Sequence, residues 1–546
     1  MMAAPWFSKI PTPPGQLQPL PKTFLVKRSG KLRSRPVKLT AKTTISPPSG
    51  PAQRLLQEPP AKSNFLAVIH LTLTTILFSL VAPLAAAPAK NVVIFLVDDL
   101  GYKDLGCYGS DYYETPNIDK LAKESLRFTD AYAACAVCTP TRASMLTGKY
   151  PARMMLTNWL PAGRWDAAKN KLREGRFLRA MPLEEFTLAE SLKASGMQNC
   201  FIGKWHLGGE PFYYPRHQGF HKNVAGCDHG NPGDYFYPFK GNWSIPTTGK
   251  RVKWQTYDGG KKGDFLTDVL TDEAVSFIKK EEKPFMLYMS YYGVHTPFQA
   301  KKDKIAKYAK KAPKLSKYRH IYAGMVESID DSIGRIVSAL KQKGIYEDTL
   351  IIFTSDNGGA AGATDHSPLR GNKGCYYEGG IRVPFLLKSP GIKPGENATP
   401  IISNDVYPTV LEALGHTQRP HQHIDGLSIM PLTRGEKLTR DSLFWHFPHY
   451  NGHPSALPCS VIRQGDWKLI VSYDPENIEL YNLQDDISEK TNLAETMPEM
   501  RDKLLADLAT WKKSVGAEEM QTNPQFGSGN VIKNIKTKDY EVPVGK

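Results

Sequence analysis

The sequence predicts an α/β fold, with one large sheet covered by helices on both faces, followed by a smaller C-terminal α+β subdomain. Short apolar segments alternate with amphipathic helical segments through residues 90–440, as strands and crossover helices do in α/β sheets. The pattern changes near residue 441, where several short strands are followed by a single helix. We therefore expect a main domain over residues 90–440, and a subdomain with a tail over residues 441–546.

Each predicted strand is a short apolar run, and each predicted helix has apolar residues at helical spacing. The strands predicted for the main domain are 92–99, 285–292, 349–354 and 383–388. The helices predicted there are 117–128, 141–147, 188–194, 319–343 and 406–414. In the subdomain the predicted strands are 457–463, 467–472 and 479–482, and the predicted helix is 499–514. From residue 515 onward we expect a loose tail.

The first part of the chain has the composition of a leader. Residues 1–63 are Pro-rich and basic, and residues 64–87 form a long apolar run that ends in small residues. This order is typical of a secretory signal, and the Ala-rich end favours cleavage and export to the periplasm or the medium. The alternative is that the segment 64–89 is retained as a membrane anchor. Residues 1–63 are interpreted as a disordered tail or as the product of a start codon placed too far upstream.

The net charge of +16 does not indicate a nucleic-acid partner. Residues 1–63 contain eleven Lys or Arg and one acidic residue, so they hold much of the basic excess. The rest of the chain is only mildly basic for its size. We therefore expect no nucleic-acid partner, and a membrane partner only if the leader is retained.

Two pairs of oxygen-bearing side chains follow predicted strands. Asp98 and Asp99 end one apolar run, and Asp356 and Asn357 follow another. Ligands of α/β sheets gather beyond the carboxyl ends of the strands, and four such side chains would suit Ca²⁺ or Mg²⁺ better than Zn²⁺. The alternative is that the first pair caps its strand and the second forms an ordinary turn.

The segment 138–148 reads Cys-Thr-Pro-Thr-Arg-Ala-Ser-Met-Leu-Thr-Gly. Cys138 comes just before a predicted helix, where backbone N–H groups favour an anionic nucleophile or a bound anion, and Arg142 can bind an oxyanion. The chain has seven cysteines, and an odd number in an exported protein leaves one unpaired, which is a candidate functional residue. Cys135 and Cys138 could also form a redox pair or half of a zinc site, but no surrounding pattern supports either.

This segment resembles the signature of type I sulfatases, Cys-x-Pro-Ser/Ala-Arg followed by Leu-Thr-Gly, with Thr141 in place of Ser or Ala. The other motifs of that family follow in order. They are Gly-Lys-Trp-His at 203–206, Val-His-Thr-Pro with His295, and Leu-Arg-Gly-Asn-Lys-Gly with Lys373. The resemblance extends over residues 90–515.

The resemblance implies the fold of the alkaline phosphatase superfamily, in which a large mixed sheet lies between helices and a smaller sheet follows. It implies hydrolysis of sulfate esters by a formylglycine that a maturation enzyme makes from Cys138, and one Ca²⁺ per subunit. The metal ligands implied are Asp98, Asp99, the modified Cys138, Asp356 and Asn357. The catalytic residues implied, besides Cys138, are Arg142, Lys204, His206, His295 and Lys373. Among these, Lys204 and Lys373 would neutralise the sulfate oxygens, His295 or Lys373 would protonate the leaving alcohol, and His206 would help to remove a proton from the hydrated formylglycine.

Two other functions are weighed against this one. A phosphodiester or phosphonate monoester hydrolase of the same superfamily is the nearer alternative, and a non-catalytic, metal-stabilised binding protein is the more distant one. A two-zinc phosphatase would need Asp/His pairs, for which 228–229 and 365–366 are candidates, but Asp356 with Asn357 fits a single calcium better.

The substrate is expected to be a sulfated carbohydrate, because an exported sulfatase resembles enzymes that act on sulfated polysaccharides. The aromatic and His-rich segment 445–450 would suit the rim of a sugar pocket. Packing between the two domains is the alternative interpretation of this segment.

Overall fold

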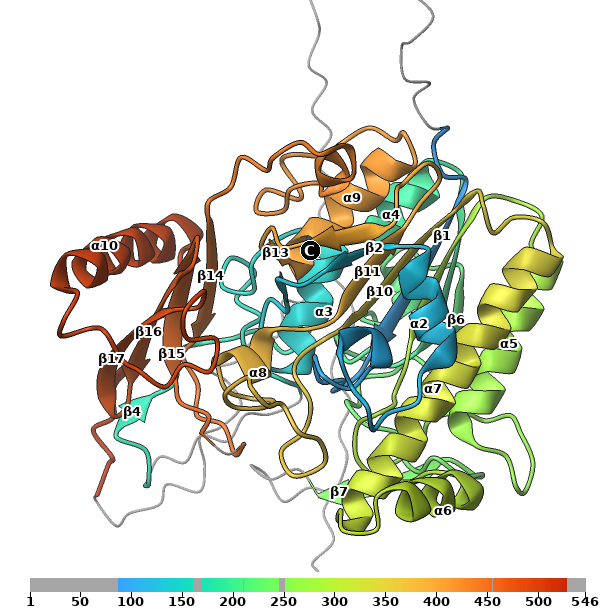
Figure 1. The fold of residues 1–546 in the computed structure, drawn as a ribbon, viewed down its shortest axis with the longest axis horizontal. Coiled ribbons are helices and arrows are strands. Elements are labelled where there is room, and N and C mark those ends of the chain that lie inside the picture. The colour runs from blue at the N-terminus through green and yellow to red at the C-terminus, as the bar shows by residue number, and fades with distance from the viewer. Residues whose placement is uncertain (1–86, 161–167, 210, 245–250, 454, 528–546) are drawn as a thin grey trace, which may run out of the picture. The chain divides into compact units, whose positions relative to one another are not determined.

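The computed structural model describes residues 87–527 except 161–167, 210, 245–250 and 454 (Figure 1). The predictions for residues 1–63, and for the apolar run as far as residue 86, lie outside this part of the chain. Among the described residues, no helix is both long and apolar enough to cross a membrane.

The centre of the main domain is a mixed sheet of eight strands in the order β12-β2-β11-β10-β1-β9-β5-β6. Five neighbouring strands are parallel: β10 (Thr349–Ser355), β1 (Asn91–Val97), β9 (Phe285–Ser290), β5 (Gln198–Gly203) and β6 (Lys222–Val224). On the other side of β10 the sheet continues with β11 (Phe385–Lys388), β2 (Leu126–Phe128) and β12 (Gly395–Asn397). Strand β11 is antiparallel to β10, so the sheet is mixed, as the resemblance implied.

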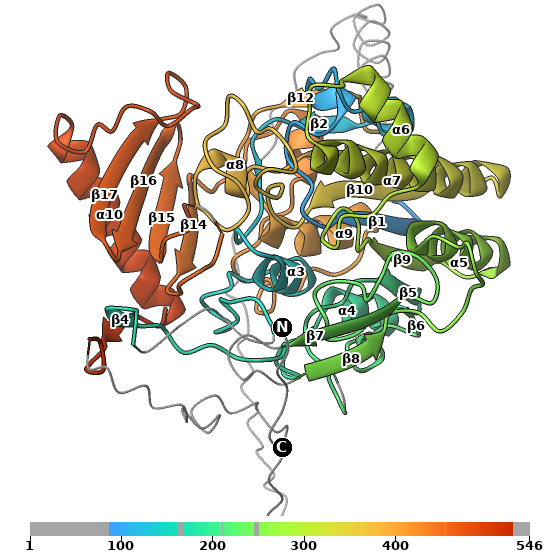
Figure 2. The same ribbon diagram turned by 90° about the horizontal axis from the view of Figure 1, so that it is seen from below.

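Helices cover both faces of this sheet (Figures 1 and 2). Alternate residues of β1 point to opposite faces, and every residue of β1 is buried. One face packs against α2 (Pro116–Lys123), α5 (Leu266–Lys280) and α7 (Lys317–Gln342). The other face packs against α3 (Cys138–Thr147), α4 (Leu188–Ala194) and α9 (Val406–Ala413). Burial on both faces explains why the central strands are apolar throughout.

The C-terminal subdomain is an antiparallel sheet with one long helix, α10 (Pro498–Val515) (Figure 2). Its strands are β14 (Ser442–Phe447), β15 (Cys459–Gln464), β16 (Trp467–Tyr473) and β17 (Glu476–Asn482), paired in sequence order. Phe444 of β14 stacks on Trp511 of α10, with ring centroids 4.8 Å apart.

Smaller elements complete the described chain. Paired short strands are β3 (Ala131–Tyr132) with β13 (Ile401–Ile402), β4 (Leu172–Arg173) with β18 (Gln521–Thr522), and β7 (Lys240–Ser244) with β8 (Arg251–Gln255). Two further helices are α6 (Lys302–Lys311) and α8 (Glu378–Ile381), and single 3₁₀ turns occur at Gly106–Tyr108, Pro215–His217, Ser403–Asp405 and Met430–Arg434.

Several predicted elements differ from the structure. The predicted helix 117–128 ends at Lys123, and its last residues form β2, where Leu126 and Phe128 pair with β11. Helix α3 begins at Cys138 rather than Thr141, because a proline is tolerated in the first turn of a helix. The tail is not wholly loose, since β18 pairs with β4. The segment 445–450 packs between the domains, where the Trp445 indole donates a hydrogen bond to the Ala133 carbonyl (2.8 Å), so the rim interpretation is wrong.

Candidate active site

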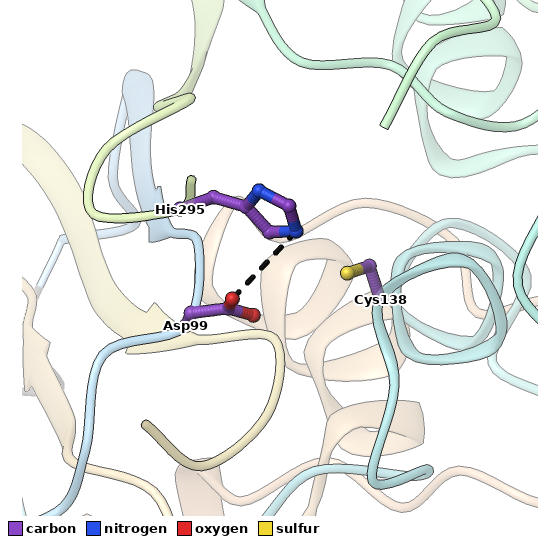
Figure 3. A group of neighbouring side chains, drawn as sticks. All are labelled: Asp99, Cys138 and His295. Atoms are coloured by element: carbon purple, nitrogen blue, oxygen red, sulfur yellow. Dashed lines mark ion pairs between the residues drawn. The ribbon is translucent and has the colours of Figure 1, made fainter. Parts of the chain in front are cut away.

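The acidic residues predicted to hold a cation meet at the carboxyl edge of the main sheet. Strands β1 and β10 are paired with Val97 opposite Ser355, so the side chains that follow them lie next to one another. The Asn357 amide donates to Asp99 Oδ1 (2.8 Å), and the Asp99 backbone N–H donates to Asp356 Oδ1 (3.2 Å). Helix α3 directs its first residue, Cys138, at the same point, and the sulfur points toward Asp99 and His295 (Figure 3).

These residues make a set of donors that fits a hard cation. One ligand atom from each of Asp98, Asp99, Asp356 and Cys138 lies within 4.8 Å of the others, and all four residues are buried. The Asn357 Oδ1 atom is also buried, and it has no hydrogen-bond partner among the described residues. A buried carbonyl oxygen left unpaired is costly unless something else binds it. Carboxylate and amide oxygens are the ligands that Ca²⁺ prefers, so this donor set fits Ca²⁺.

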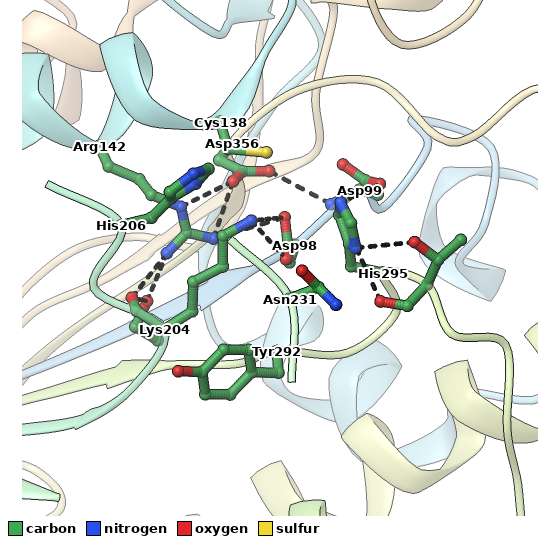
Figure 4. Close-up of polar contacts among 12 residues, drawn as sticks. Asp98, Asp99, Cys138, Arg142, Lys204, His206, Asn231, Tyr292, His295 and Asp356 are labelled. Atoms are coloured by element: carbon green, nitrogen blue, oxygen red, sulfur yellow. Dashed lines mark hydrogen bonds and ion pairs between the residues drawn. The ribbon is translucent and has the colours of Figure 1, made fainter. Parts of the chain in front are cut away.

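Three cations lie against the three carboxylates, and Figure 4 shows the contacts of Lys204 and Arg142. Lys204 Nζ lies 2.7 Å from Asp98 Oδ2, Lys373 Nζ lies 2.7 Å from Asp99 Oδ1, and Arg142 Nη2 lies 2.7 Å from Asp356 Oδ2. Burial raises the pKa of Asp98 well above its usual range. Burial also acts to raise the pKa values of Asp99 and Asp356, but Lys373 holds the first, and Arg142 the second, below the usual range.

Arg142 holds together residues of the site through hydrogen bonds from its guanidinium group. Its Nη1 donates to the Lys204 carbonyl (2.9 Å) and to Ser290 Oγ (2.6 Å), while Nε donates to Asp356 Oδ2 (2.8 Å). The side chain is buried and contacts Asp356 rather than lining the cavity described below. We therefore expect Arg142 to position Asp356.

Cys138 is a buried thiol among charged groups. Burial raises the pKa of Cys138 to about 12, although Lys204 and Lys373 act to lower it. Lys373 Nζ lies 3.5 Å from the sulfur. The unmodified side chain is therefore a neutral thiol at physiological pH, and neutral thiols are poor nucleophiles.

The two candidate histidines lie on loops after strands of the main sheet. His206 and Lys204 follow β5, which ends at Gly203, and His206 has a positive φ of 58°. Lys204 and His206 therefore lie on a loop rather than on one face of a strand. The His206 Nε2 atom lies 2.6 Å from the Leu160 carbonyl, and Nδ1 is buried without a partner among the described residues. Since a carbonyl only accepts, Nε2 carries the proton and Nδ1 has a free lone pair.

His295 follows β9, and its ring reaches the acidic residues and Cys138, which together form the floor of the site. Its Nε2 lies 3.7 Å from Asp99 Oδ2, and its Nδ1 lies 2.9 Å from the Thr296 carbonyl. Burial lowers the pKa of His295 to about 3, and it also places the pKa of His206 well below the usual range, so both rings are neutral near pH 7.

None of the seven cysteines is in a disulfide bond, so the expectation that only one would be unpaired is not met. Cys135 Sγ lies 3.0 Å from the Tyr376 hydroxyl instead of bonding to Cys138. Buried thiols of this kind pack as small apolar side chains.

A cavity of about 550 Å³ opens above this floor. Asp99, Cys138, His206, His295 and Lys373 line its base. Further residues line the rest of the cavity, and none of them was assigned to the active site from the sequence. They are Trp159, Leu160, His229, Asn231, Asn242, Trp254 and His453. His229 was considered as a zinc ligand, but neither it nor His366 belongs to the acidic cluster. No short motif marks the side-wall residues, because separate loops and a hairpin bring them together.

The sequence comparisons agree with this geometry. The family model "Sulfatase" matches residues 90–416, and the model "N-sulphoglucosamine sulphohydrolase, C-terminal" matches residues 371–514. A sulfatase of Formosa agariphila is 34% identical, over 80% of this chain and 90% of its own length. Human arylsulfatase A is 33% identical, over 72% of this chain and 77% of its own length. Human N-acetylgalactosamine-6-sulfatase is 32% identical, over 66% of this chain and 69% of its own length.

A solved structure has a similar fold. The crystal structure of Ps i-CgsB in complex with k-i-k-neocarrahexaose has a TM-score of 0.64 and 28% sequence identity. The match covers 78% of this chain and 93% of that one.

Proposed function

The chain belongs to the sulfatase family, and from that premise we propose that it hydrolyses the sulfate esters of carbohydrates, using a formylglycine made from Cys138 and a bound Ca²⁺. Sulfuric ester hydrolysis is the activity of this family. The observation that most supports the proposal is the position of Cys138 at the start of α3, facing Lys373 and the acidic cluster at the base of a cavity.

The metal would be held by Asp98, Asp99, Asp356 and Asn357. Asn357 Oδ1, buried without a partner among the described residues, supports this assignment. Bound there, Ca²⁺ would supply a positive charge that lowers the pKa of an oxygen nucleophile and attracts the sulfate group. Lys204, Lys373 and Arg142 carry at least as much positive charge as the three carboxyl groups carry negative charge, so a divalent ion would leave the site with a net positive charge for an anionic ester.

The nucleophile would come from Cys138 after modification. Burial keeps its thiol protonated, which argues against a role for the unmodified side chain. A maturation enzyme would convert it to formylglycine, whose hydrated form supplies an attacking hydroxyl. His206 is suited to accept a proton nearby, because its Nδ1 has a free lone pair.

The remaining charged side chains would act on the sulfate and on the leaving alcohol. Lys204 and Lys373 would stabilise negative charge on the sulfate oxygens. His295 and Lys373 are the two candidates for protonating the leaving alcohol. His295 is the more accessible, with 18% of its side chain exposed against 5% for Lys373, and this favours His295. Because its ring is neutral in the free site, His295 would have to take up its proton when the anionic sulfate ester binds beside it.

A carbohydrate substrate is supported by the relatives and by the cavity. One relative is named N-acetylgalactosamine-6-sulfatase, and a similar structure holds k-i-k-neocarrahexaose. The sides of the cavity combine aromatic rings with amide groups, which suits a sugar. Export is proposed from the composition of residues 64–89.

The test combines peptide mass with sulfate release. The enzyme is made in its native host or with a maturation enzyme, and the mass of the tryptic peptide 128–142 is measured. We expect an aldehyde or its hydrate at Cys138, and release of sulfate from a panel of sulfated mono- and oligosaccharides. The Cys138→Ala variant should release none. An active enzyme whose Cys138 is an unmodified thiol would contradict the mechanism, and a preference for phosphate or phosphonate esters would contradict the substrate class.

A further inference from the structure

We propose that His229 and Trp254 form the wall that binds the sugar ring, and that this wall determines which sulfated carbohydrate is accepted. The inference rests on the proposed function, because it takes a sulfated carbohydrate as the substrate. It assigns the recognition of the sugar to a segment that lies outside the acidic floor.

The two side chains come from different elements and are held together by stacking. His229 lies on the loop 227–233, and Trp254 lies on β8. Their ring centroids are 4.3 Å apart, and the ring planes differ by 25°. Both residues line the cavity that has Cys138 and His295 at its base. The imidazole is therefore fixed by the indole on one side, and the pair presents aromatic surface to a ligand on the floor.

The loop that presents His229 is packed tightly between the floor and the hairpin. A Cβ atom added to Gly230 would lie 2.4 Å from His206 Cε1, so only glycine lets the loop pack against this ring. A Cβ atom on Gly233 would lie 2.1 Å from the Gly241 nitrogen of β7. The backbone N–H of His206 also donates to the Cys227 carbonyl (3.0 Å). The position of His229 is thus fixed relative to the floor on one side and to the hairpin on the other.

The chemistry of this wall suits a neutral sugar ring. The faces of aromatic rings are electron-rich and attract the C–H groups of a pyranose. Asn231 and Asn242 line the same cavity and offer amide donors and acceptors for hydroxyl groups. Burial lowers the pKa of His229, so the imidazole is neutral near pH 7. Two charged residues of opposite sign contact this wall: Arg251 Nε donates to Asn242 Oδ1 (2.8 Å), and Asp228 Oδ1 lies 3.6 Å from His229 Nε2. We expect recognition here to be mainly of a ring and its hydroxyl groups.

The experiment compares binding of the sugar with binding of sulfate alone. The variants are Trp254→Ala, His229→Ala and Trp254→Phe, which keeps an aromatic face. The Tyr318→Ala variant is the control, because it removes an exposed aromatic ring of α7 that does not line the cavity. The probes are the 4- and 6-monosulfates of galactose and of N-acetylgalactosamine, and inorganic sulfate serves as a competitive inhibitor. The peptide mass at Cys138 shows that each variant is matured.

We expect both alanine variants to raise KM for the preferred sulfated sugar about tenfold, which corresponds to the loss of one aromatic contact. The inhibition constant of sulfate should change less than about threefold, because sulfate alone occupies the floor. Trp254→Phe should recover most of the loss, and Tyr318→Ala should match the wild type.

Two results would overturn the inference but not the proposed function. The first is an unchanged KM in both alanine variants. The second is a rise in the sulfate inhibition constant as large as the rise in KM, which would mean that the two rings only support the floor of the site. A wild-type enzyme that hydrolyses other sulfate esters but no sulfated sugar would overturn the proposed substrate, and the inference with it. The two failures are distinguishable, because the failure of the proposed substrate is seen before any variant is made.

Discussion

At the scale of single residues, the site is a network of buried charges of opposite sign. Lys204, Lys373 and Arg142 each lie nearest to a different carboxylate, Arg142 also lies 3.6 Å from Asp98, and all six groups are buried. Removing one member leaves its partner charged and unpaired in a medium of low dielectric constant, which is strongly unfavourable. Substitutions of these residues should therefore lower stability as well as activity. Residues that are not part of these ion pairs between a cation and a carboxylate, such as Asn357, allow clearer tests of individual roles.

The first prediction separates the two candidates for the general acid. In His295→Asn we expect hydrolysis of a sulfated sugar to fall at least about 100-fold, because a sugar alcohol needs a proton in order to leave. Hydrolysis of 4-nitrophenyl sulfate should fall much less, since nitrophenolate leaves without a proton. Lys373→Met should lower both rates to a similar degree. A selective loss of sugar hydrolysis in Lys373→Met, with equal losses in His295→Asn, would reverse the assignment.

The second prediction concerns the metal. Adding Ca²⁺ to chelator-treated enzyme should raise the melting temperature, because a ligand that binds only the folded state stabilises it. Asn357→Ala removes one neutral oxygen donor, and it should shift the Ca²⁺ concentration needed for this effect about tenfold higher. The charge of the site is unchanged in this variant, so a change in net charge cannot explain the shift. Equal Ca²⁺ dependence in the two proteins would exclude Asn357 as a ligand.

The residues at the base of the site could be predicted from the sequence because they lie in short motifs that follow strands. Asp98, Asp99, Asp356 and Asn357 needed only the positions of two strands and the rule that strand ends meet. The pairing of each lysine with one particular carboxylate could not be predicted, because it depends on the conformations of the loops that follow β5 and β10. Trp254 and Asn242 could not be predicted either, since a hairpin distant in sequence carries them to the cavity.

At the scale of elements, the strands and helices that bury one continuous apolar face were the easiest to predict. Helix α4 was predicted with its observed bounds, and Thr187 and Glu190 form a capping box at its start. Helix α5 was not predicted, although Leu266, Leu270, Ala274 and Ile278 recur at every fourth position and are buried. This spacing is a signal that a search for helical periodicity would find. Strand β6 has only three residues and is too short for such a signal.

The third prediction concerns the loop 227–233. Gly230→Ala should displace either this loop or the His206 ring, because the added methyl group would lie within 2.4 Å of that ring. We expect kcat to fall at least about tenfold, with a melting temperature close to that of the wild type, because the change is confined to a loop and one side chain. Steady-state kinetics and thermal unfolding measure both effects.

A matched control for this substitution exists elsewhere in the chain. Gly395 in β12 has open space where a Cβ atom would lie, and its backbone is not left-handed, so Gly395→Ala should leave kcat unchanged. If Gly230→Ala had the wild-type kcat, the packing of the loop against His206 would have no role in catalysis.

At the scale of the whole molecule, buried ion pairs join the C-terminal subdomain to the main domain close to the site. Lys468 Nζ of β16 lies 2.8 Å from Glu378 Oε1 of α8 and 2.8 Å from Glu489 Oε1. The Glu378 backbone N–H donates to Glu489 Oε2 (2.7 Å). Helix α8 begins five residues after Lys373. The subdomain therefore supports the segment that carries Lys373, a proposed catalytic residue, and this contact gives the subdomain a role beyond that of a separate unit.

The fourth prediction concerns the pH dependence of this junction. Burial raises the pKa of Glu489 from 4.5 to about 7, although Lys468 acts to lower it. Between these two values the folded protein binds more protons at this group than the unfolded chain, so stability falls as the pH rises. The contribution is fully present below pH 4.5 and is lost as the pH passes about 7. Its upper limit is about 3 kcal/mol.

Glu489→Gln removes this titration and keeps an oxygen acceptor for the Glu378 backbone N–H. We therefore expect its melting temperature to depend less on pH than that of the wild type between pH 5 and pH 8, at constant Ca²⁺. Loss of the contact with Lys468 should also change the stability itself, so the slope of the melting temperature against pH is the quantity to compare. Glu476→Gln, at an exposed position of β17, is the control and should retain the wild-type slope. Parallel curves for Glu489→Gln and the wild type would mean that Glu489 is ionised throughout this range, and that the junction is held by the full set of ion pairs.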